Sequence, residues 1–280
     1  PTRVPVAREF PVQDVDGDGK SDLLWVNPKS SVFGYWTMNG PSVAGLWSKT
    51  VASGYRVAAT GDFNGDGKVD VVWTSAADDL YLWSSNGAGF DAKYIGTYPA
   101  GDVIVGAGDV GGDGKSDLLW MDAKTGTFGY WAMDGATIVR KWSTPVAAGY
   151  SVAATGDFNG DGKVDVVWTS ARHDLYLWES NGADFDPYYI GTYPAGWTLA
   201  GAGDVNGDGL SDLLWRNQGA SAFGYWIMDG PRQVAGRVIA ASGRYTIAAI
   251  EDFNGDGKVD VMWTSDAHDL YLWTGNGLGF

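Results

Sequence analysis

Residues 157–168 read DFNGDGKVDVVW, an acidic loop followed by a short apolar run. The same acidic pattern, D-x-[D/N/G]-G-D-G-x-x-D, occurs six times at intervals of 47 or 48 residues. Its copies begin at Asp14, Asp62, Asp109, Asp157, Asp204 and Asp252. Self-similarity at such a period indicates a repeat architecture in which each repeat is one supersecondary unit. Six units fill the 280 residues, so we expect one domain, residues 1–280.

The segments between the loops predict short β-strands. In the second repeat, YRVAATGD precedes the loop, and VDVVWTS, DLYLWSS and AKYIGTY follow it. Val, Tyr, Trp and Thr dominate these runs, while Gly, Asn, Asp and Pro separate them. Four strands per repeat form a propeller blade, and propellers have about 4–8 blades. The predicted fold is therefore all-β, a six-bladed β-propeller with four antiparallel strands per blade and the acidic loop between the first and second strands.

The expected blades lie near residues 6–53, 54–100, 101–148, 149–195, 196–243 and 244–280. We expect residues 1–5 to close the last blade as its outer strand. Odd repeats share SDLLW and FGYW, whereas even repeats share DLYLW, so a double-blade unit of about 95 residues occurs three times. This duplication predicts pseudo-threefold symmetry.

Each acidic loop has the pattern of oxygen-bearing residues that is typical of a calcium site, because Ca²⁺ takes several hard oxygen ligands. Positions 1, 3, 5 and 9 supply side-chain oxygens, and position 7 supplies its backbone carbonyl. The predicted ligands are Asp14, Asp16, Asp18, Lys20 and Asp22 in loop one; Asp62, Asn64, Asp66, Lys68 and Asp70 in loop two; Asp109, Asp113, Lys115 and Asp117 in loop three; Asp157, Asn159, Asp161, Lys163 and Asp165 in loop four; Asp204, Asn206, Asp208, Leu210 and Asp212 in loop five; and Asp252, Asn254, Asp256, Lys258 and Asp260 in loop six.

Five or six structural calcium ions are therefore expected. Loop three lacks a ligand at position 3, where Gly111 stands, so we expect weaker binding there. An EF-hand is excluded because it needs a bidentate Glu at position 12, where every copy here has Trp.

The repeats resemble the FG-GAP/VCBS family, found in the calcium-bearing blades of integrin α-chain propellers and in many secreted bacterial proteins. Fungal N-acetylglucosamine-binding propeller lectins within this family are similar in size and style. The resemblance covers essentially the whole chain and implies an extracellular, calcium-stabilised propeller. It does not fix a ligand, because one fold hosts many functions.

The composition narrows the classes of partner. The formal charge is −15, but more than half of the 34 acidic residues lie in the loops, so acidity reflects metal sites more than partners. No basic patch favours nucleic acid, and no apolar run is long enough to insert into a membrane. There is no cysteine, and no signal peptide at the N-terminus; the chain is expected to be a mature or excised form.

Candidate ligand-binding residues lie at the end of each even blade opposite the acidic loops. There an aromatic plane, a carboxylate and, in two of three copies, an imidazole recur together, which suits an array of sugar hydroxyls. These residues are Tyr55, Asp78, Asp79, Tyr150, His173, Asp174, Tyr245, His268 and Asp269, with Tyr98 and Tyr193 nearby. Most of the 15 Trp residues recur with the repeat, as at Trp25, Trp36, Trp73, Trp131 and Trp226, and are expected to pack between blades.

The preferred functional hypothesis is a secreted, multivalent, lectin-like protein that binds glycans or glycoproteins without catalysis. No HExxH, GxSxG or phosphate loop occurs, and the distinctive residues recur threefold, whereas an active site is normally unique. Linked weak sites gain avidity. Two alternatives stay open: an adhesion or protein-interaction module of a larger secreted protein, and a polysaccharide-degrading enzyme, whose paired carboxylates need not be close in sequence.

Overall fold

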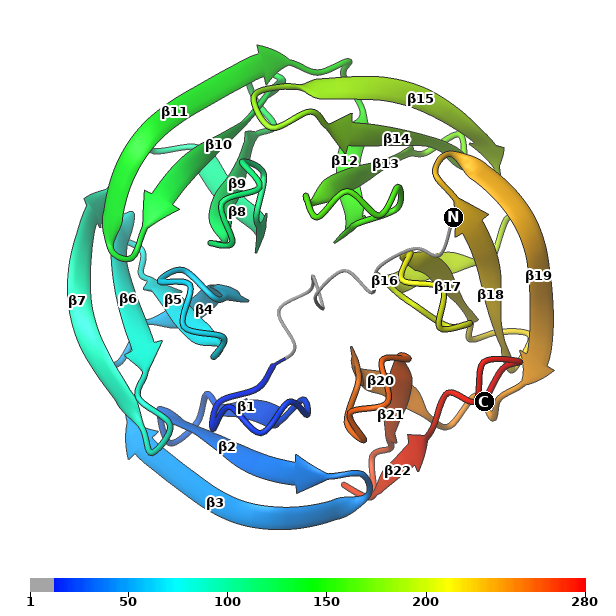
Figure 1. Cartoon of the computed structure of the whole chain (residues 1–280), viewed down its shortest axis with the longest axis horizontal. Coiled ribbons are helices and arrows are strands. Elements are labelled where there is room, and N and C mark those ends of the chain that lie inside the picture. Colours follow the sequence, from blue (N-terminus) through cyan, green and yellow to red (C-terminus); the bar gives the residue numbers. More distant parts are fainter. Residues whose placement is uncertain (1–12) are drawn as a thin grey trace, which may run out of the picture. The chain divides into compact units, whose positions relative to one another are not determined.

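The computed structural model describes residues 13–280, which form 22 strands in six antiparallel sheets (Figure 1). The predicted class is confirmed: the fold is an all-β six-bladed propeller, and residues 13–280 contain no helix. A search of these residues for a helix able to cross a bilayer finds none. Closure of the last blade by residues 1–5 lies outside the described residues.

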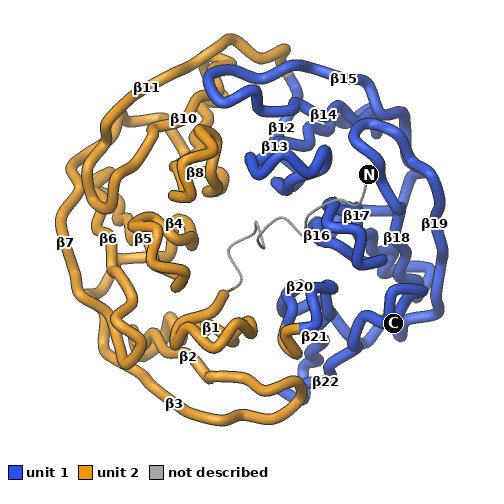
Figure 2. Tube along the Cα trace, viewed as in Figure 1, with its two compact units in different colours: residues 1–10, 149–252, 256–280 blue, residues 11–148, 253–255 orange. Residues whose placement is uncertain are grey.

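The chain divides into two compact units, each with three sheets (Figure 2). Of the described residues, one unit comprises 13–148 and 253–255. Its blade one has β1 (Leu23–Asn27), β2 (Val32–Asn39) and β3 (Ser42–Thr50); blade two has β4 (Arg56–Gly61), β5 (Asp70–Thr74), β6 (Asp79–Ser85) and β7 (Phe90–Thr97); blade three has β8 (Asp102–Gly108), β9 (Asp117–Asp122), β10 (Thr127–Asp134) and β11 (Thr137–Pro145).

Of the described residues, the other unit comprises 149–252 and 256–280. Its blade four has β12 (Tyr150–Gly156), β13 (Asp165–Ser170), β14 (Asp174–Ser180) and β15 (Phe185–Thr192); blade five has β16 (Thr198–Gly203), β17 (Asp212–Asn217), β18 (Ala222–Asp229) and β19 (Arg232–Ala240); blade six has β20 (Thr246–Glu251), β21 (Asp260–Thr264) and β22 (Leu270–Trp273).

The first strands of successive blades lie against each other within a unit, as β4 against β8 and β12 against β16. A Cβ built on Gly61 would lie 2.5 Å from Ser116 Oγ, and one on Gly156 would lie 2.6 Å from Ser211 Oγ. A larger residue at Gly61 or Gly156 would push the neighbouring blade away, which explains the Gly before these acidic loops; Gln13 and Glu251 stand at this position before loops one and six.

The cores between blades are aromatic. Phe33 meets the buried Trp73 edge-on with ring centroids 5.1 Å apart, and Phe223 meets the buried Trp263 in the same way at 5.5 Å. Trp131 is buried as expected, but Trp36 and Trp226 remain half-buried. Edge-to-face pairs of this kind add to the free energy gained by burial alone.

The glycine of the FGYW motif makes room for a tryptophan. A Cβ on Gly129 would lie 2.4 Å from the Trp142 carbonyl oxygen and 2.5 Å from Cζ2 of Trp120, whose indole covers the glycine. Gly34 in blade one stands in the same relation to Trp25. The glycine of this motif therefore allows the main chain to lie in close contact with the tryptophan ring.

Replacing Gly129 by Ala is expected to destabilise the protein by about 1–3 kcal/mol, because one contact is with main chain that cannot move aside. Urea unfolding monitored by tryptophan fluorescence measures the change. Gly111→Ala is the matched control, since its new Cβ would meet nothing closer than 3.9 Å. Equal midpoints for the two variants would contradict the packing role.

Candidate functional site

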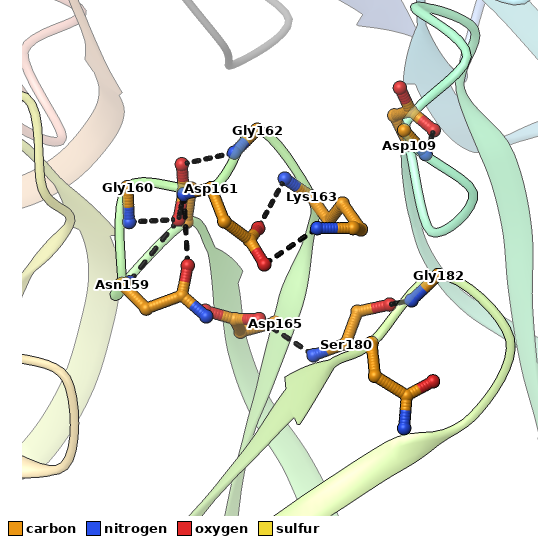
Figure 3. Close-up of polar contacts among 12 residues, drawn as sticks. Asp109, Asn159, Gly160, Asp161, Gly162, Lys163, Asp165, Ser180 and Gly182 are labelled. Atoms are coloured by element: carbon orange, nitrogen blue, oxygen red, sulfur yellow. Dashed lines mark hydrogen bonds and ion pairs between the residues drawn. The ribbon is translucent and has the colours of Figure 1, made fainter.

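Each acidic loop is wound around the carboxylate of its first residue. In loop four, Gly160 N–H donates to Asp157 Oδ1 at 2.6 Å and Gly162 N–H donates to Asp157 Oδ2 at 3.0 Å. Asp161 N–H then donates to Asn159 Oδ1 at 2.9 Å (Figure 3). Gly160 and Gly162 have φ of 74° and 88°, a region that favours glycine. These bonds hold the oxygens of positions 1 and 3 at one side of a tight turn.

Neighbouring loops are joined through the same residue. The carbonyl oxygen of the first Asp accepts a hydrogen bond from the N–H of position 8 in the next loop: Val69 to Asp14 at 2.7 Å, Ser116 to Asp62 at 2.6 Å, Ser211 to Asp157 at 2.7 Å and Val259 to Asp204 at 2.7 Å. Anything that fixes one loop therefore also fixes the start of the next blade.

Loop one brings three predicted ligands together. Carboxylate oxygens of Asp14, Asp16 and Asp18 all lie within 4.8 Å of one another, with Asp14 buried and the other two exposed. Burial and the nearby carboxylate of Asp18 raise the pKa of Asp16. Three hard oxygen donors at this spacing fit a divalent cation such as Ca²⁺. Of the other loops, four carry Asn at position 3 and loop three carries Gly111.

The lysine at position 7 pairs with the carboxylate at position 5. Lys163 Nζ lies 2.6 Å from Asp161 Oδ2, and Lys20, Lys68 and Lys258 make the corresponding pairs at 2.8, 3.0 and 3.2 Å. Lys115 of loop three instead pairs with Asp134 at 2.6 Å, and loop five has the buried Leu210. A cation bound to position 5 would compete with the ammonium groups of these half-buried lysines.

The predicted ligand at position 9 lies inside the blade and outside the Asp14–Asp16–Asp18 group. Asp165 is fully buried; its Oδ2 accepts from Phe158 N–H and its Oδ1 from Ser180 N–H, both at 2.9 Å. Burial raises the pKa of Asp165 to about 8. The same burial raises the pKa of Asp22, Asp70, Asp117 and Asp212 to about 7. This carboxylate therefore ties the loop to the hairpin beyond it, a role that sequence reasoning missed.

The structure brings together the tyrosine and aspartate predicted for each even blade. Tyr55 donates to Asp79 Oδ2 at 2.5 Å, Tyr150 to Asp174 Oδ2 at 2.6 Å and Tyr245 to Asp269 Oδ2 at 3.0 Å. The other oxygen of each carboxylate accepts from Ser75, Ser170 or Ser265. Both carboxylate oxygens thus already have protein partners.

The remaining candidates divide between strained turns and buried positions. Asp78, His173 and His268 occupy the left-handed region, with φ of 55°, 60° and 59°. Tyr98 is buried and its hydroxyl lies 2.8 Å from that of Thr74. Tyr193 stacks on His173 at 5.0 Å. Tyr98 and Tyr193 therefore pack against these turns, and their N–H groups donate to the carbonyl oxygens of Asp78 and His173.

Each even blade also carries tyrosines that sequence reasoning did not select. Tyr81 lies 5.7 Å from Tyr55 and 5.0 Å from Tyr94, and Tyr176 lies likewise 5.7 Å from Tyr150 and 5.1 Å from Tyr189. In blade six Tyr271 meets Tyr245 at 5.4 Å. Tyr94, Tyr189 and Tyr271 are 52, 57 and 54% exposed. We call these sets the tyrosine clusters. The register between strands brings these tyrosines together, and the order of residues along the chain does not reveal that register.

The family follows from the loops and the repeats. The FG-GAP-like repeat profile matches residues 14–73, 62–120 and 157–215, more than half of the chain, and the FG-GAP repeat profile matches residues 195–239. The chain belongs to the FG-GAP-like repeat family. FG-GAP repeats often bind Ca²⁺, in keeping with the donor set of loop one.

Solved structures share the fold at low identity. A chain of the Photorhabdus luminescens Tc holotoxin pore aligns with a TM-score of 0.64 and 15% identity, over 97% of this chain and 14% of that one. A chain of a nidogen/laminin complex aligns with a TM-score of 0.57 and 13% identity, over 87% of this chain and 85% of that one. A chain of the complex of BBS1N with ARL6DN aligns with a TM-score of 0.55 and 12% identity, over 94% of this chain and 89% of that one. A search of curated protein sequences found no significant match.

The tyrosine–aspartate bonds of this FG-GAP propeller predict a delayed phenol titration. The carboxylate acceptor raises the pKa of Tyr55, Tyr150 and Tyr245 to about 12. The hydrogen bond from the serine hydroxyl, and after it the one from the tyrosine, lowers the pKa of each partner aspartate. The stabilisation is therefore present at neutral pH, and it is lost as pH rises through about 12 or falls through the lowered aspartate pKa. Absorbance of the phenolate measures the alkaline limb.

Asp79→Asn, Asp174→Asn and Asp269→Asn combined should return three phenols towards a pKa of about 10. Asp91→Asn is the control, because its carboxylate is exposed and bonds Asn86. An unchanged alkaline titration in the triple variant would refute the pairing.

Proposed function

We propose that this FG-GAP propeller is a secreted, non-catalytic protein that binds carbohydrate at several sites and is stabilised by calcium. The observation that supports this most is the recurrence of the tyrosine clusters in blades two and four, where Tyr94 and Tyr189 on the outer strands are more than half exposed. The aspartate and serine beside each cluster hold the neighbouring tyrosine in place. Rigid, exposed aromatic rings on loops and strand edges suit ligand contact.

The chemistry of tyrosine fits a sugar. A ring face packs against the C–H face of a pyranose, and a phenol hydroxyl exchanges hydrogen bonds with sugar hydroxyls. A single shallow cluster binds weakly, but clusters on one rigid chain act together on a surface that displays many copies of a glycan. Glycans or glycoproteins at a cell or matrix surface are therefore the proposed partners.

Calcium has a structural role in this proposal. Five or six ions are expected, one per loop, with loop three weakest because Gly111 offers no side-chain oxygen. Asp14, Asp16 and Asp18 would hold the ion of loop one. Calcium stoichiometry by isothermal titration tests the number, and Gly111→Asp should strengthen the weakest site. An unaltered isotherm in that variant would count against the ligand assignment.

A glycan array, run in calcium and after chelation, tests the function. We expect binding to a small set of terminal sugars, strongly reduced in a variant combining Tyr94→Ala, Tyr189→Ala and Tyr271→Ala. Leu46→Ala, at a residue 74% exposed, is the control for general loss of exposed apolar surface. No binding in either condition would reject carbohydrate recognition and favour a protein-interaction module. Turnover of a polysaccharide would reject the non-catalytic assignment.

A further inference from the structure

Blade three holds a small cavity that the tyrosine clusters do not touch. Its volume is about 250 Å³, below the roughly 300–1,000 Å³ of pockets for drug-sized ligands. The side chains around it are Pro99, Asp102, Trp120, Trp131, Lys141 and Ser143. Trp142 also borders it, but its ring stacks on Tyr130 at 5.6 Å on the other face of the sheet, so the main chain makes this border.

The register of the sheet places the side chains on one face. Trp131 pairs with Lys141 across β10 and β11, and Trp120 pairs with Gly129 across β9 and β10. The Trp120 and Trp131 rings are 5.9 Å apart with an angle of 31° between their planes. Because side chains alternate between the two faces of a strand, both indoles and the lysine lie on the same side. Two aromatic rings therefore form one wall of the cavity.

Asp102 supplies a carboxylate with no hydrogen-bond or ion-pair partner among residues 13–280, unlike Asp79 and its equivalents. It is half-buried, and burial, with the carboxylates of Asp122 and Asp78 nearby, raises its pKa. Lys141 lies close enough to act on it electrostatically, and its Nζ lies 5.4 Å from the centroid of the Trp131 ring. The cavity thus presents one acceptor group and one donor group of opposite charge.

Blade five carries different residues at two of the positions around this cavity. Its sequence repeats blade three at a distance of 95 residues, but Trp197 stands in the position of Asp102 and Gly236 in that of Lys141. The turn is the same: Trp197 N–H donates to Pro194 O as Asp102 N–H donates to Pro99 O. A Cβ on Gly224 would lie 3.4 Å from the Trp197 ring, whereas the corresponding Gly129 is covered by Trp120. An indole therefore lies beside this glycine in both blades, from Trp197 in blade five and from Trp120 in blade three.

We propose that the cavity of blade three binds one neutral pyranose ring of a glycan against the wall formed by Trp120 and Trp131, with Asp102 accepting from sugar hydroxyls and Lys141 donating to them. The sugar would lay its C–H face on the half-buried Trp120, because Trp131 is buried and already has the Lys141 ammonium over its ring. The ligand class rests on the proposed carbohydrate function; the location of the site does not. This site is separate from the tyrosine clusters and occurs in one blade.

The charges argue against the other ligand that aromatic pockets favour. Quaternary ammonium groups bind against indole faces, but here Lys141 already holds its own ammonium over Trp131. The Lys141 ammonium would repel a second cation. The Asp102 carboxylate would in turn repel a simple anion. A neutral, hydroxyl-rich ring uses both groups without an uncompensated charge.

The test uses the full chain in calcium and methyl β-glycosides of N-acetylglucosamine, glucose and galactose as probes. Binding is followed by quenching of tryptophan fluorescence and by saturation-transfer NMR. Asp102→Trp with Lys141→Gly rebuilds the residues of blade five and should weaken binding of the preferred glycoside about tenfold or more, since a charged hydrogen-bond partner and the space are both removed. Asp229→Trp with Lys124→Gly, at exposed positions, is the matched control and should bind normally.

Asp102→Asn, which keeps the shape, provides a second variant if the double variant does not fold, and it should also weaken binding. Normal glycoside binding in folded Asp102→Trp/Lys141→Gly, with loss in the tyrosine-cluster variant, would overturn this site and leave the proposed function standing. Binding of choline in place of the glycosides would also overturn it. If neither the glycosides nor the array gives binding, both proposals fail.

Discussion

Exhaustive removal of calcium is expected to lower the melting temperature of this protein by more than about 10 °C. An ion that binds the folded state alone stabilises it by about 2.7 kcal/mol when present at 100 times its dissociation constant. In a domain of this size, 1 kcal/mol shifts the melting temperature by roughly 2–4 °C. Two occupied loops would therefore suffice for the effect, and five or six are proposed.

The geometry of the loops gives the physical reason. Without a cation, Asp14, Asp16 and Asp18 hold like charges within 4.8 Å in a partly buried turn. Loops one, two, four and five are also joined to the next loop, as by the bond from Val69 N–H to Asp14 O, so loosening one of them affects two blades. Loss of calcium should thus act on the whole β-structure rather than on isolated turns.

Thermal melts by circular dichroism, with and without chelator, measure this effect. Chelator already saturated with calcium controls for the chelator itself, and restoring calcium should restore the melting temperature. Asp16→Ala, which removes one oxygen donor from loop one, should reproduce a fraction of the loss in calcium and almost none in chelator. A melting temperature that does not respond to chelation would remove calcium from the account of stability.

The sequence predicted the features that repeat within one blade. Six copies of the acidic loop, separated by β-rich runs, were sufficient for the propeller class, because each copy fixes a turn and the strands on either side of it. The small residues of the first strands have a local explanation as well. Gly61 and Gly156 lie where the next blade leaves no space for a side chain. Features that depend on residues close together in the sequence can therefore be predicted from the sequence alone.

Features that depend on the register between strands could not be predicted in the same way. Tyr94 joins Tyr81 and Tyr55 through pairing of β6 with β7, although 39 residues separate the first and last of them. Asp102 and Lys141 stand at positions where the three odd blades carry different residues, and that they meet beside Trp131 could be learned only from the sheet. The spacing of the acidic pattern predicts the aspartate at position 9 as a metal ligand, whereas its two buried N–H donors lie seven and fifteen or sixteen residues away in the sequence.

Replacing that aspartate gives the second large effect. Asp165→Ala is expected to destabilise the protein by about 2–6 kcal/mol, since each buried donor left without an acceptor costs about 1–3 kcal/mol. The two donors are the N–H groups of Phe158 and Ser180, both in fully or nearly fully buried residues. Phe158 belongs to the core shared with Leu175 and Leu213, so movement of its main chain disturbs packing as well.

The experiment separates this structural role from metal binding by running urea unfolding in chelator as well as in calcium. In chelator, Asp165→Ala should remain strongly destabilised, because its hydrogen bonds do not need the ion. Asp161→Ala, in the same loop but exposed and paired with Lys163, should cost little in chelator and should act mainly when calcium is present. If both variants lost stability in calcium alone, position 9 would be a ligand and nothing more, and the tie between loop and hairpin would contribute little to the fold.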